Sequence, residues 1–435
     1  MFAGPVKTLL RPTAIRAIAG WLRWRRRLAA RRVVRREPRV AVVGFLETAS
    51  GLGTAARGLL AALAPWQPRA VSISTVAPTP RVPTDGAVEA SSPPDAMLAA
   101  DVAVHVFNPD VLWAVVRRHG PRLFLDGRLA LAVVNWETQR LPRGWRPVLA
   151  MYDVLCAPST FTARAVAAAT GRPVAVLPNC VPLRPLRRRG RDDGRFEFLC
   201  LFDHHSDLER KHPRAAIRAF VAACRDLPPG IGGRLRVKCH GDTPPDVVAS
   251  LRAEAQTAPI EIVARTLSAE DMERLWNDCD CLVSLHRSEG FGLPVAEAIA
   301  RGIPVITTGQ GGVLDFVAAD GCLLVPGGPA RPTAERGPYR EWSGWVEPDP
   351  AAAAAAIRSV ILEYPAALAR AEAARARLAA WAAPEAVQAA FLAAVATACP
   401  LTAAALAAAA PAAAAHASAA AAAGLIRPPS RRQRP

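Results

Sequence analysis

No two of the nine cysteines in this 435-residue chain form a CxxC pair. Cys200, Cys239 and Cys322 lie inside apolar strand-like runs, which is typical of reduced, buried thiols in a cytosolic protein. Cys279 and Cys281 would face the same side of a strand, but no Cys or His at metal-ligand spacing accompanies them. The cysteine pattern therefore argues against a metal or redox site.

Two nucleotide-binding signatures are missing as well. The sequence has no Walker A loop ending in GKS or GKT and no GxGxxG fingerprint, which argues against ATPase and hydride-transfer functions. It also offers no convincing Ser/His/Asp or Cys/His set for nucleophilic catalysis.

Acidic residues are scarce only at the two ends of the chain. Of the net charge of +17, residues 1–37 carry +10 and residues 400–435 carry +4, which leaves +3 for the body between them. A nearly neutral body argues against nucleic-acid binding.

The N-terminal arm, residues 1–37, lacks an apolar run near the ~20 residues that span a bilayer. Its basic cluster follows the apolar part, unlike the order in a signal peptide. Trp21, Leu22, Trp24 and Leu28 alternate with arginines, which fits a cationic amphipathic helix on an anionic membrane surface. A disordered basic arm fits equally well, and both interpretations stay open.

Short apolar runs alternate with helical stretches from residue 38 onward, which predicts α/β architecture with parallel strands buried on both faces. A first set of strands is expected at 39–45, 102–107, 129–134, 154–159 and 174–179. A second set is expected at 196–202, 235–240, 260–264, 281–285, 305–308 and 322–326. The pattern predicts two doubly wound Rossmann-like domains, residues 38–185 and 196–372, joined by a linker at 186–195. C-terminal helices are expected at 373–398 and should pack back towards the first domain. A low-complexity tail, rich in alanine and basic residues, is expected at 399–435.

The run EGFGLPVAE is the most informative segment. Glu289 is expected at the end of a buried strand and Glu297 about one turn inside the next helix. Gly290 and Gly292 leave room for a ligand near the backbone, and Pro294 suits the first helical turn, whose free N–H groups form an anion site. The segment predicts a phosphorylated ligand between two carboxylates.

Arg210 and Lys211 lie just before a helix that Pro213 opens, where adjacent cations suit a diphosphate. A solvated charge pair is the alternative. His204, His205 and His212 lie nearby, but without a carboxylate at matching spacing they do not indicate a metal site.

Further candidates follow the strands of the first domain. His105, at a strand end before Asn108, suits contact with a sugar hydroxyl, although an ordinary buried histidine is the alternative. Trp136 and Glu137 follow another strand and suit a carbohydrate face, although Trp136 equally suits packing. A Gly-rich turn at Gly51 and Gly53 precedes a helix and serves either a ligand or the packing of helix on sheet.

These pieces, in this order, resemble glycosyltransferase family 4, the retaining enzymes of the GT-B class. EGFGLPVAE looks like that family's paired-glutamate motif. SGLGTAARGL, NWETQRLP and ERKHP look similar to the branch that builds bacterial polysaccharides, often with mannose. The resemblance covers roughly residues 39–370. It implies an active site in the cleft between an acceptor-binding N-terminal domain and a nucleotide-sugar-binding C-terminal domain.

The resemblance also implies roles for individual residues. Donor binding would fall to Arg210, Lys211, Gly290, Phe291, Gly292, Leu293 and Glu297, with Lys211 on the diphosphate and Glu297 on the ribose. Glu289 and His105 would act at the transferred sugar. The acceptor side of the cleft would hold Gly51, Gly53, Asn108, Trp136 and Glu137.

The departures from the family pattern are the adjacency of Arg210 and Lys211, Asp315 in place of a common Glu, and an insertion or a rebuilt loop at 326–345.

The expected function is therefore a cytoplasmic, retaining hexosyltransferase of bacterial surface polysaccharide synthesis, peripheral on the inner membrane through residues 1–37. It would use a GDP- or UDP-hexose of mannose or glucose type, a glycan or lipid-linked acceptor, and neither cofactor nor metal. Two alternatives stay open. One is a carbohydrate hydrolase that uses Glu289 and Glu297, and the other is a non-catalytic nucleotide-sugar-binding protein at the membrane.

Overall fold

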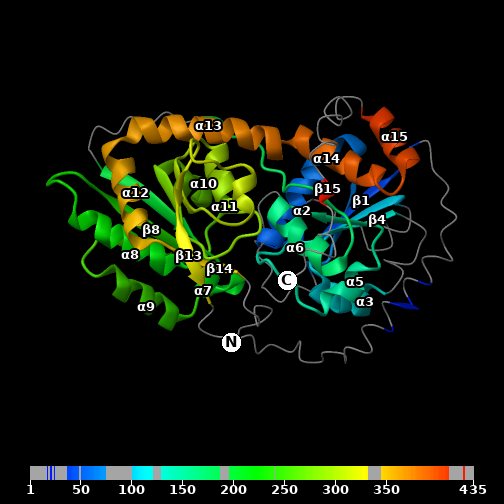
Figure 1. Cartoon of the computed structure of the whole chain (residues 1–435), viewed down its shortest axis with the longest axis horizontal. Coiled ribbons are helices and arrows are strands. Elements are labelled where there is room, and N and C mark those ends of the chain that lie inside the picture. The colour runs from blue at the N-terminus through cyan, green and yellow to red at the C-terminus, as the bar shows by residue number, and fades with distance from the viewer. Residues whose placement is uncertain are drawn as a thin grey trace. The chain divides into compact units, whose positions relative to one another are not determined.

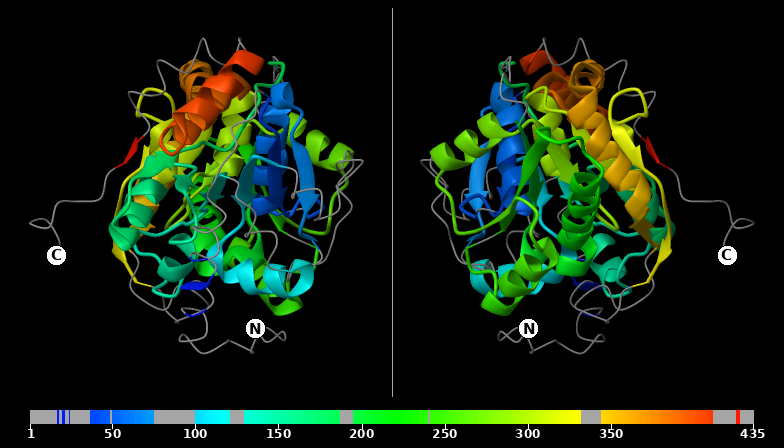
Figure 2. Two further views of the ribbon diagram at one scale, coloured as in Figure 1. Left: turned by 90° about the vertical axis from the view of Figure 1, so that its right-hand side faces the viewer. Right: turned by 90° about the vertical axis from the view of Figure 1, so that its left-hand side faces the viewer.

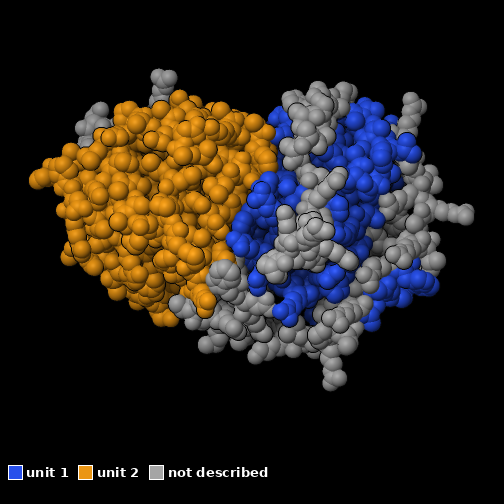
Figure 3. Space-filling view, viewed as in Figure 1, with its two compact units in different colours: residues 1–180, 382–435 blue, residues 181–381 orange. Residues whose placement is uncertain are grey.

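The computed structural model describes residues 37–48, 50–74, 100–120, 129–186, 195–239, 241–331, 344–410 and 425–426, together with Ala17, Gly20, Trp21 and Trp24. The chain divides into two compact units, residues 1–180 with 382–435 and residues 181–381, which Figure 3 colours separately. Each unit has its own sheet and its own hydrophobic core.

The first unit is built on a seven-stranded sheet in the order β15-β6-β5-β4-β3-β1-β2. Its strands are β1 (Val40–Gly44), β2 (Arg69–Ser72), β3 (Val102–Val106), β4 (Leu129–Val133), β5 (Val154–Ala157), β6 (Val174–Val176) and β15 (Leu425–Ile426). β1 to β6 pair in parallel, and β15 pairs antiparallel with β6. Every residue of β1, β3 and β4 is buried, as expected of a parallel sheet covered on both faces.

Helices of the first unit come from both ends of the chain (Figure 1). They are α2 (Gly51–Ala62), α3 (Leu112–His119), α5 (Trp145–Leu149), α6 (Thr160–Thr170), α14 (Pro384–Ala396) and α15 (Pro400–Ala409). The Ser50 hydroxyl caps α2 and the Ser159 hydroxyl caps α6, so each helix starts where a side chain accepts from a free N–H.

α14 and α15 are part of the first unit's core. The Gln388 side chain donates to the Ala62 carbonyl at 2.8 Å, and the Trp66 indole donates to the Leu406 carbonyl at 2.8 Å. Leu406 is fully buried, so residues 400–409, which we expected in a low-complexity tail, form a packed helix. Alanine-rich sequence is consistent with this, because alanine has the highest helix propensity. Residues 411–424 and 427–435 lie outside the described residues.

The second unit holds a six-stranded parallel sheet in the order β12-β11-β10-β7-β8-β9. Its strands are β7 (Arg195–Leu201), β8 (Gly232–Cys239), β9 (Ile260–Ala264), β10 (Cys281–Ser284), β11 (Val305–Thr308) and β12 (Leu323–Val325). A separate antiparallel pair follows, β13 (Gly327–Ala330) with β14 (Trp345–Pro348).

The helices of this unit are α7 (Leu208–Lys211), α8 (Pro213–Arg225), α9 (Pro245–Ala255), α10 (Ala269–Asp278), α11 (Leu293–Ala300), α12 (Pro350–Leu362) and α13 (Tyr364–Ala382, whose last residue counts with the first unit). α8 and α12 pack together (Figures 1 and 2) and share one core cluster with the central strands. The amphipathic pattern of α8 places Ile217 and Phe220, both fully buried, in that cluster.

The expected fold class is confirmed, because both units are doubly wound parallel sheets. All eleven expected strands are present, with ends shifted by a few residues. β2, β13, β14 and β15 were not predicted. They are two to four residues long and carry too little periodic pattern to be recognised in sequence.

One helical stretch of the described residues, Tyr364–Ala396, is long and apolar enough to cross a membrane by length and composition. Half of its most apolar window is buried inside the protein. Phe391 and Leu392 in it belong to the first unit's core. A core helix satisfies the same criterion, so the stretch is a weak indication of a membrane span.

Candidate functional site

Three loops of the second unit meet at one edge of its sheet. They follow β7, β10 and β11, which are neighbours in the sheet and run in parallel. Because ligands of doubly wound sheets bind beyond the carboxyl ends of the strands, this edge is the candidate site.

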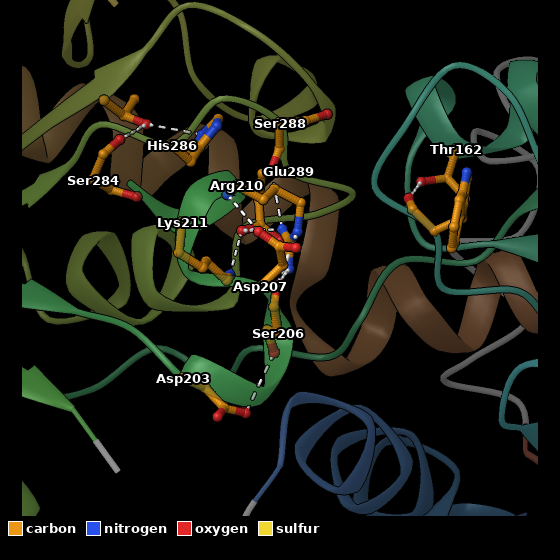
Figure 4. A network of polar contacts seen from close by, with 12 residues as sticks. Thr162, Asp203, Ser206, Asp207, Arg210, Lys211, Ser284, His286, Ser288 and Glu289 are labelled. Atoms are coloured by element: carbon orange, nitrogen blue, oxygen red, sulfur yellow. Dashed lines mark hydrogen bonds and ion pairs between the residues drawn. The ribbon is translucent and has the colours of Figure 1, made fainter. Parts of the chain in front are cut away.

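An ion pair joins the first two of these loops (Figure 4). Lys211 ends α7, and its Nζ atom lies 2.5 Å from Oε2 of Glu289, which follows β10. Both side chains are mostly buried, at 16% and 13% exposed. Sequence analysis predicted both residues at this edge, and the structure brings them into contact.

Arg210 takes a different place from the one we expected. Its side chain is 1% exposed, its Nε and Nη2 donate to the Ser206 carbonyl, and its Nη1 donates to the Ser288 carbonyl at 3.0 Å. Nη1 also lies 3.5 Å from Oε2 of Glu289. The guanidinium therefore ties the two loops together and backs the glutamate, while Lys211 is the more accessible cation.

The surroundings of Glu289 keep it ionised. Burial by itself would raise the pKa of this carboxyl, but the charges of Lys211 and Arg210 outweigh that effect and lower it to about 2. A group with so low a pKa is a carboxylate at every physiological pH.

Close packing and a positive φ account for Gly292 of EGFGLPVAE and for Gly311 in the loop after β11. Gly292 adopts φ +90 as the N-cap of α11, and a Cβ atom there would lie 2.4 Å from the Val313 side chain. Gly311 also has φ +90, and a Cβ atom there would lie 2.3 Å from the Glu289 carbonyl. That carbonyl accepts from the N–H of Gly312 at 2.9 Å, so the loop after β11 supports the loop that carries Glu289.

α11 starts at Leu293 with Pro294 in its first turn, as expected. The first N–H groups of a helix have no partner within it, so this terminus directs donors and a positive dipole end to the sheet edge. Gly290 and Phe291 precede it. The Phe291 ring is buried against Phe316, with ring centroids 5.2 Å apart, and so anchors the turn.

Glu297 is the fifth residue of α11 and partly buried. Burial raises the pKa of its carboxyl, and the charge of Arg301 opposes that shift. Arg301 is held by Glu273 and lies over the Trp276 ring. The two glutamates of the motif are thus shifted in opposite directions.

His286 belongs to this site and was missed in the sequence. It is 1% exposed, and its Nε2 atom lies 3.5 Å from the Thr307 hydroxyl. Burial lowers its pKa to about 4, and Lys211 and Arg210 also disfavour the charged ring. The available signal was its position two residues past a buried strand.

Polar groups also follow the strands of the first unit. The Asn108 side chain, just past β3, accepts from the N–H of Asn135, just past β4, at 3.0 Å. Glu137 is partly exposed beside them. Trp136 is 3% exposed, donates to the Arg140 carbonyl at 2.8 Å and packs against Trp145, which supports its packing interpretation.

His105 is fully buried within β3. Its Nδ1 atom lies 3.0 Å from the Tyr152 hydroxyl, and its ring stacks on Phe107. We expected His105 to contact the transferred sugar, and in this packing its side chain has no accessible surface.

The two glycines of the first Gly-rich turn differ. Gly51 is exposed at the start of α2. Gly53 is buried, and a Cβ atom there would lie 2.3 Å from the Thr48 carbonyl, so packing accounts for it.

Metal ligands do not gather in the part of the chain that the structure describes, where no group of three or more His, Cys, Asp or Glu is placed to hold an ion. His204 contacts Thr243 and Asp242, while His212 contacts Glu347. These two histidines thus have separate partners.

A family model described as "Family 4 Glycosyltransferase in conflict systems" matches residues 160–390, slightly more than half of the chain. Comparison with curated proteins gives no match.

Solved structures share the fold. A mutant of S. aureus TarM in complex with Fondaparinux, alpha-GlcNAc-glycerol and UDP is 10% identical, with 67% of this chain and 54% of TarM covered and a TM-score of 0.50. The chain thus spans about half the length of TarM. Sucrose-phosphate synthase from Thermosynechococcus elongatus is 17% identical, with 81% and 94% covered and a TM-score of 0.52. At these identities the likeness shows the fold alone, two doubly wound units of the GT-B type.

Proposed function

Since the chain belongs to the family 4 glycosyltransferases of conflict systems, we propose that it transfers a hexose from a nucleoside diphosphate sugar with retention of configuration. The proposed acceptor is a glycan or a lipid-linked sugar of bacterial surface polysaccharide synthesis. The observation that carries this proposal is the Lys211–Glu289 pair beside the N-terminus of α11. A cation and a helix N-terminus suit the diphosphate, and an ionised carboxylate suits the hydroxyls of the sugar.

The proposed roles in donor binding are those that the family resemblance implies. Lys211 binds the diphosphate, and backbone N–H groups from Gly290 to Leu293 bind phosphate and sugar. Glu289 accepts hydrogen bonds from the donor sugar, and Glu297 accepts them from the ribose hydroxyls. Arg210 orients Glu289 through the contacts to Ser206 and Ser288, since its guanidinium is buried.

No metal or cofactor is assigned in this proposal. Lys211 and the dipole of α11 neutralise the charge that develops on the leaving diphosphate. Departure and attack take place on the same face of the sugar, and the leaving phosphate accepts the proton of the acceptor hydroxyl. This route needs no side-chain nucleophile, in agreement with the absence of a nucleophile–base pair in the sequence.

The acceptor is assigned to the first unit. The residues assigned to it are Asn108 and Glu137, which are partly exposed past β3 and β4, and Gly51 at the start of α2. We leave His105 and Trp136 out of this assignment because both are buried.

Nucleotide-sugar binding tests the proposal directly. UDP is the first nucleotide to try, because the TarM structure contains it, and GDP is the second. Thermal shifts with UDP, GDP, ADP and dTDP sugars should show stabilisation of roughly 2–3 kcal/mol at ~100 times the dissociation constant. Transfer is then measured with radiolabelled UDP-glucose and GDP-mannose. If no nucleotide sugar binds or turns over, the proposal is wrong.

A carbohydrate hydrolase is the second candidate, and one observation favours it. The pKa of Glu289 is lowered and that of Glu297 is raised, which is the pattern of a base with an acid. Such an enzyme would ignore UDP and GDP and would cleave a nitrophenyl glycoside, whereas a transferase would bind a nucleotide. A non-catalytic binding protein would bind the nucleotide sugar without any turnover.

The location proposed for this enzyme is the cytoplasm, peripheral on the inner membrane through residues 1–37. Of that arm the structure describes only Ala17, Gly20, Trp21, Trp24 and Glu37, and Trp21 and Trp24 are exposed. Deletion of residues 1–35 should reduce sedimentation with vesicles that contain anionic lipid. Unchanged sedimentation would refute the membrane assignment.

A further inference from the structure

The carboxylate of Glu347 bonds to two loops of the donor site at once. Glu347 lies on β14, about 60 residues beyond Glu289 in the sequence. Its Oε1 accepts from Nε2 of His212 at 2.8 Å, and its Oε2 accepts from Nε of Arg287 at 2.6 Å. His212 follows Lys211 directly, and Arg287 precedes Glu289 by two residues.

Arg287 extends the link along the backbone. Its N–H donates to the Arg210 carbonyl at 2.8 Å, and its carbonyl accepts from the N–H of Val346 at 2.9 Å. Its Nη1 lies 3.1 Å from the Glu209 carboxylate. The loop after β10 is thereby bonded to α7 on one side and to β14 on the other.

His212 is held in an unfavourable backbone conformation. It adopts φ 50 and ψ 50 between α7 and α8, in the left-handed region that a residue other than glycine seldom adopts. A side-chain partner that fixes such a residue also fixes its neighbour, and that neighbour is Lys211.

Burial and strand pairing hold β14, which carries Glu347, in place. Trp345 is 1% exposed, and the strand pairs along four residues with β13. Burial would raise the pKa of Glu347, but the hydrogen bonds from Arg287 and His212 lower it, so the carboxylate stays ionised.

We propose that Glu347 is a positioning residue of the donor site, which sets the separation of Lys211 and Glu289 by holding His212 and Arg287 together. This inference rests on the proposed function, because its effect appears in donor binding. Through Glu347, the β13–β14 pair at the end of the 326–345 segment is coupled to recognition of the diphosphate.

The experiment compares full-length wild type with Glu347→Ala, Glu347→Gln and the matched control Asp226→Asn. Asp226 forms a 2.9 Å ion pair with Arg358 away from the donor site. The Asp226→Asn variant therefore shows how the loss of one ion-paired carboxylate elsewhere in the same unit changes KM and nucleotide affinity. The affinity for UDP and GDP is measured by calorimetry, and the KM for donor and for acceptor is measured with radiolabelled UDP-glucose or GDP-mannose.

Glu347→Ala should weaken nucleotide binding and raise the donor KM about tenfold to a hundredfold, as expected for misplaced binding groups, without changing the acceptor KM. Glu347→Gln, which keeps one acceptor oxygen, should recover part of the loss. A purely structural role would instead lower kcat through a smaller active fraction and leave both KM values unchanged.

Donor KM and nucleotide affinity equal to those of Asp226→Asn would overturn the inference. If Glu347→Ala does not fold, Arg287→Met tests the same link from the other loop, with the same expected change in donor KM. A wild type that binds no nucleotide would instead defeat the proposed function, so the two failures are distinguishable.

Discussion

The Nζ atom of Lys211 lies 2.5 Å from Oε2 of Glu289 and joins the loop after β7 to the loop after β10. In the proposed function each of these side chains also binds the donor, since Lys211 binds the diphosphate and Glu289 binds the sugar. We therefore expect donor binding to exchange the contact of Lys211 with Glu289 for one with the diphosphate.

Replacement of Glu289 by glutamine should separate binding from transfer. Glu289→Gln removes the charge that competes for Lys211, so UDP or GDP should bind roughly tenfold more tightly, as expected for one charge-assisted hydrogen bond. Transfer should fall by about a hundredfold because the donor sugar loses its carboxylate. Calorimetry measures nucleotide binding, and a radiolabelled donor measures transfer. Weaker nucleotide binding would show that Lys211 does not exchange Glu289 for the diphosphate.

Loss of the lysine should be costly for folding. Lys211→Met leaves the mostly buried carboxylate of Glu289 without its closest cation and should lower the free energy of unfolding by about 3 kcal/mol. The double variant Lys211→Met/Glu289→Gln should recover most of that stability but bind no nucleotide. Urea unfolding measures the stability of the single and the double variant, and calorimetry measures their affinity for the nucleotide. Tight nucleotide binding by the double variant would show that Lys211 does not bind the donor.

His286 should make stability depend on pH. Its pKa is 6.5 in the unfolded chain and about 4 in the folded protein, so protons bind preferentially to the unfolded state. The wild type should lose up to roughly 3 kcal/mol as the pH falls from 6.5 to 4. His286→Gln should lack this component. Urea unfolding between pH 7 and pH 4 measures the difference, and parallel curves for both proteins would show that His286 is not responsible.

The two glycines at the start of α2 should respond differently to alanine. Gly53→Ala places a Cβ atom against the Thr48 carbonyl and should lower stability by about 2 kcal/mol. Gly51→Ala, at an exposed helical position, should be neutral or stabilise by less than about 1 kcal/mol. Urea unfolding of both variants measures this, and equal effects would show that close packing does not explain Gly53.

Local pattern accounts for much of the molecule. Runs such as Val40–Gly44 and Cys281–Ser284 are apolar on both faces, which is typical of parallel strands in a sheet covered on both faces. The order of those runs gives two doubly wound units. The carboxyl-end rule then places Lys211 and Glu289 at one edge, where the structure finds them.

The sequence could not predict which of the candidate side chains are buried. His105 and Trp136 follow the same strand-end pattern as Asn108 and Glu137, yet the first two are buried and the other two are partly exposed. Arg210 and Lys211 are adjacent cations, but the first is bonded to carbonyls of two loops and the second reaches the glutamate.

The sequence by itself thus determined the two sheets, the turn into α11 and the residues that reach the sheet edge, because these depend on periodicity and on spacing within a short segment. Only the tertiary structure decided which of those side chains remain accessible and that Glu347 joins His212 to Arg287. The contacts of Glu347 join residues 60 and 135 positions apart, which no local pattern encodes.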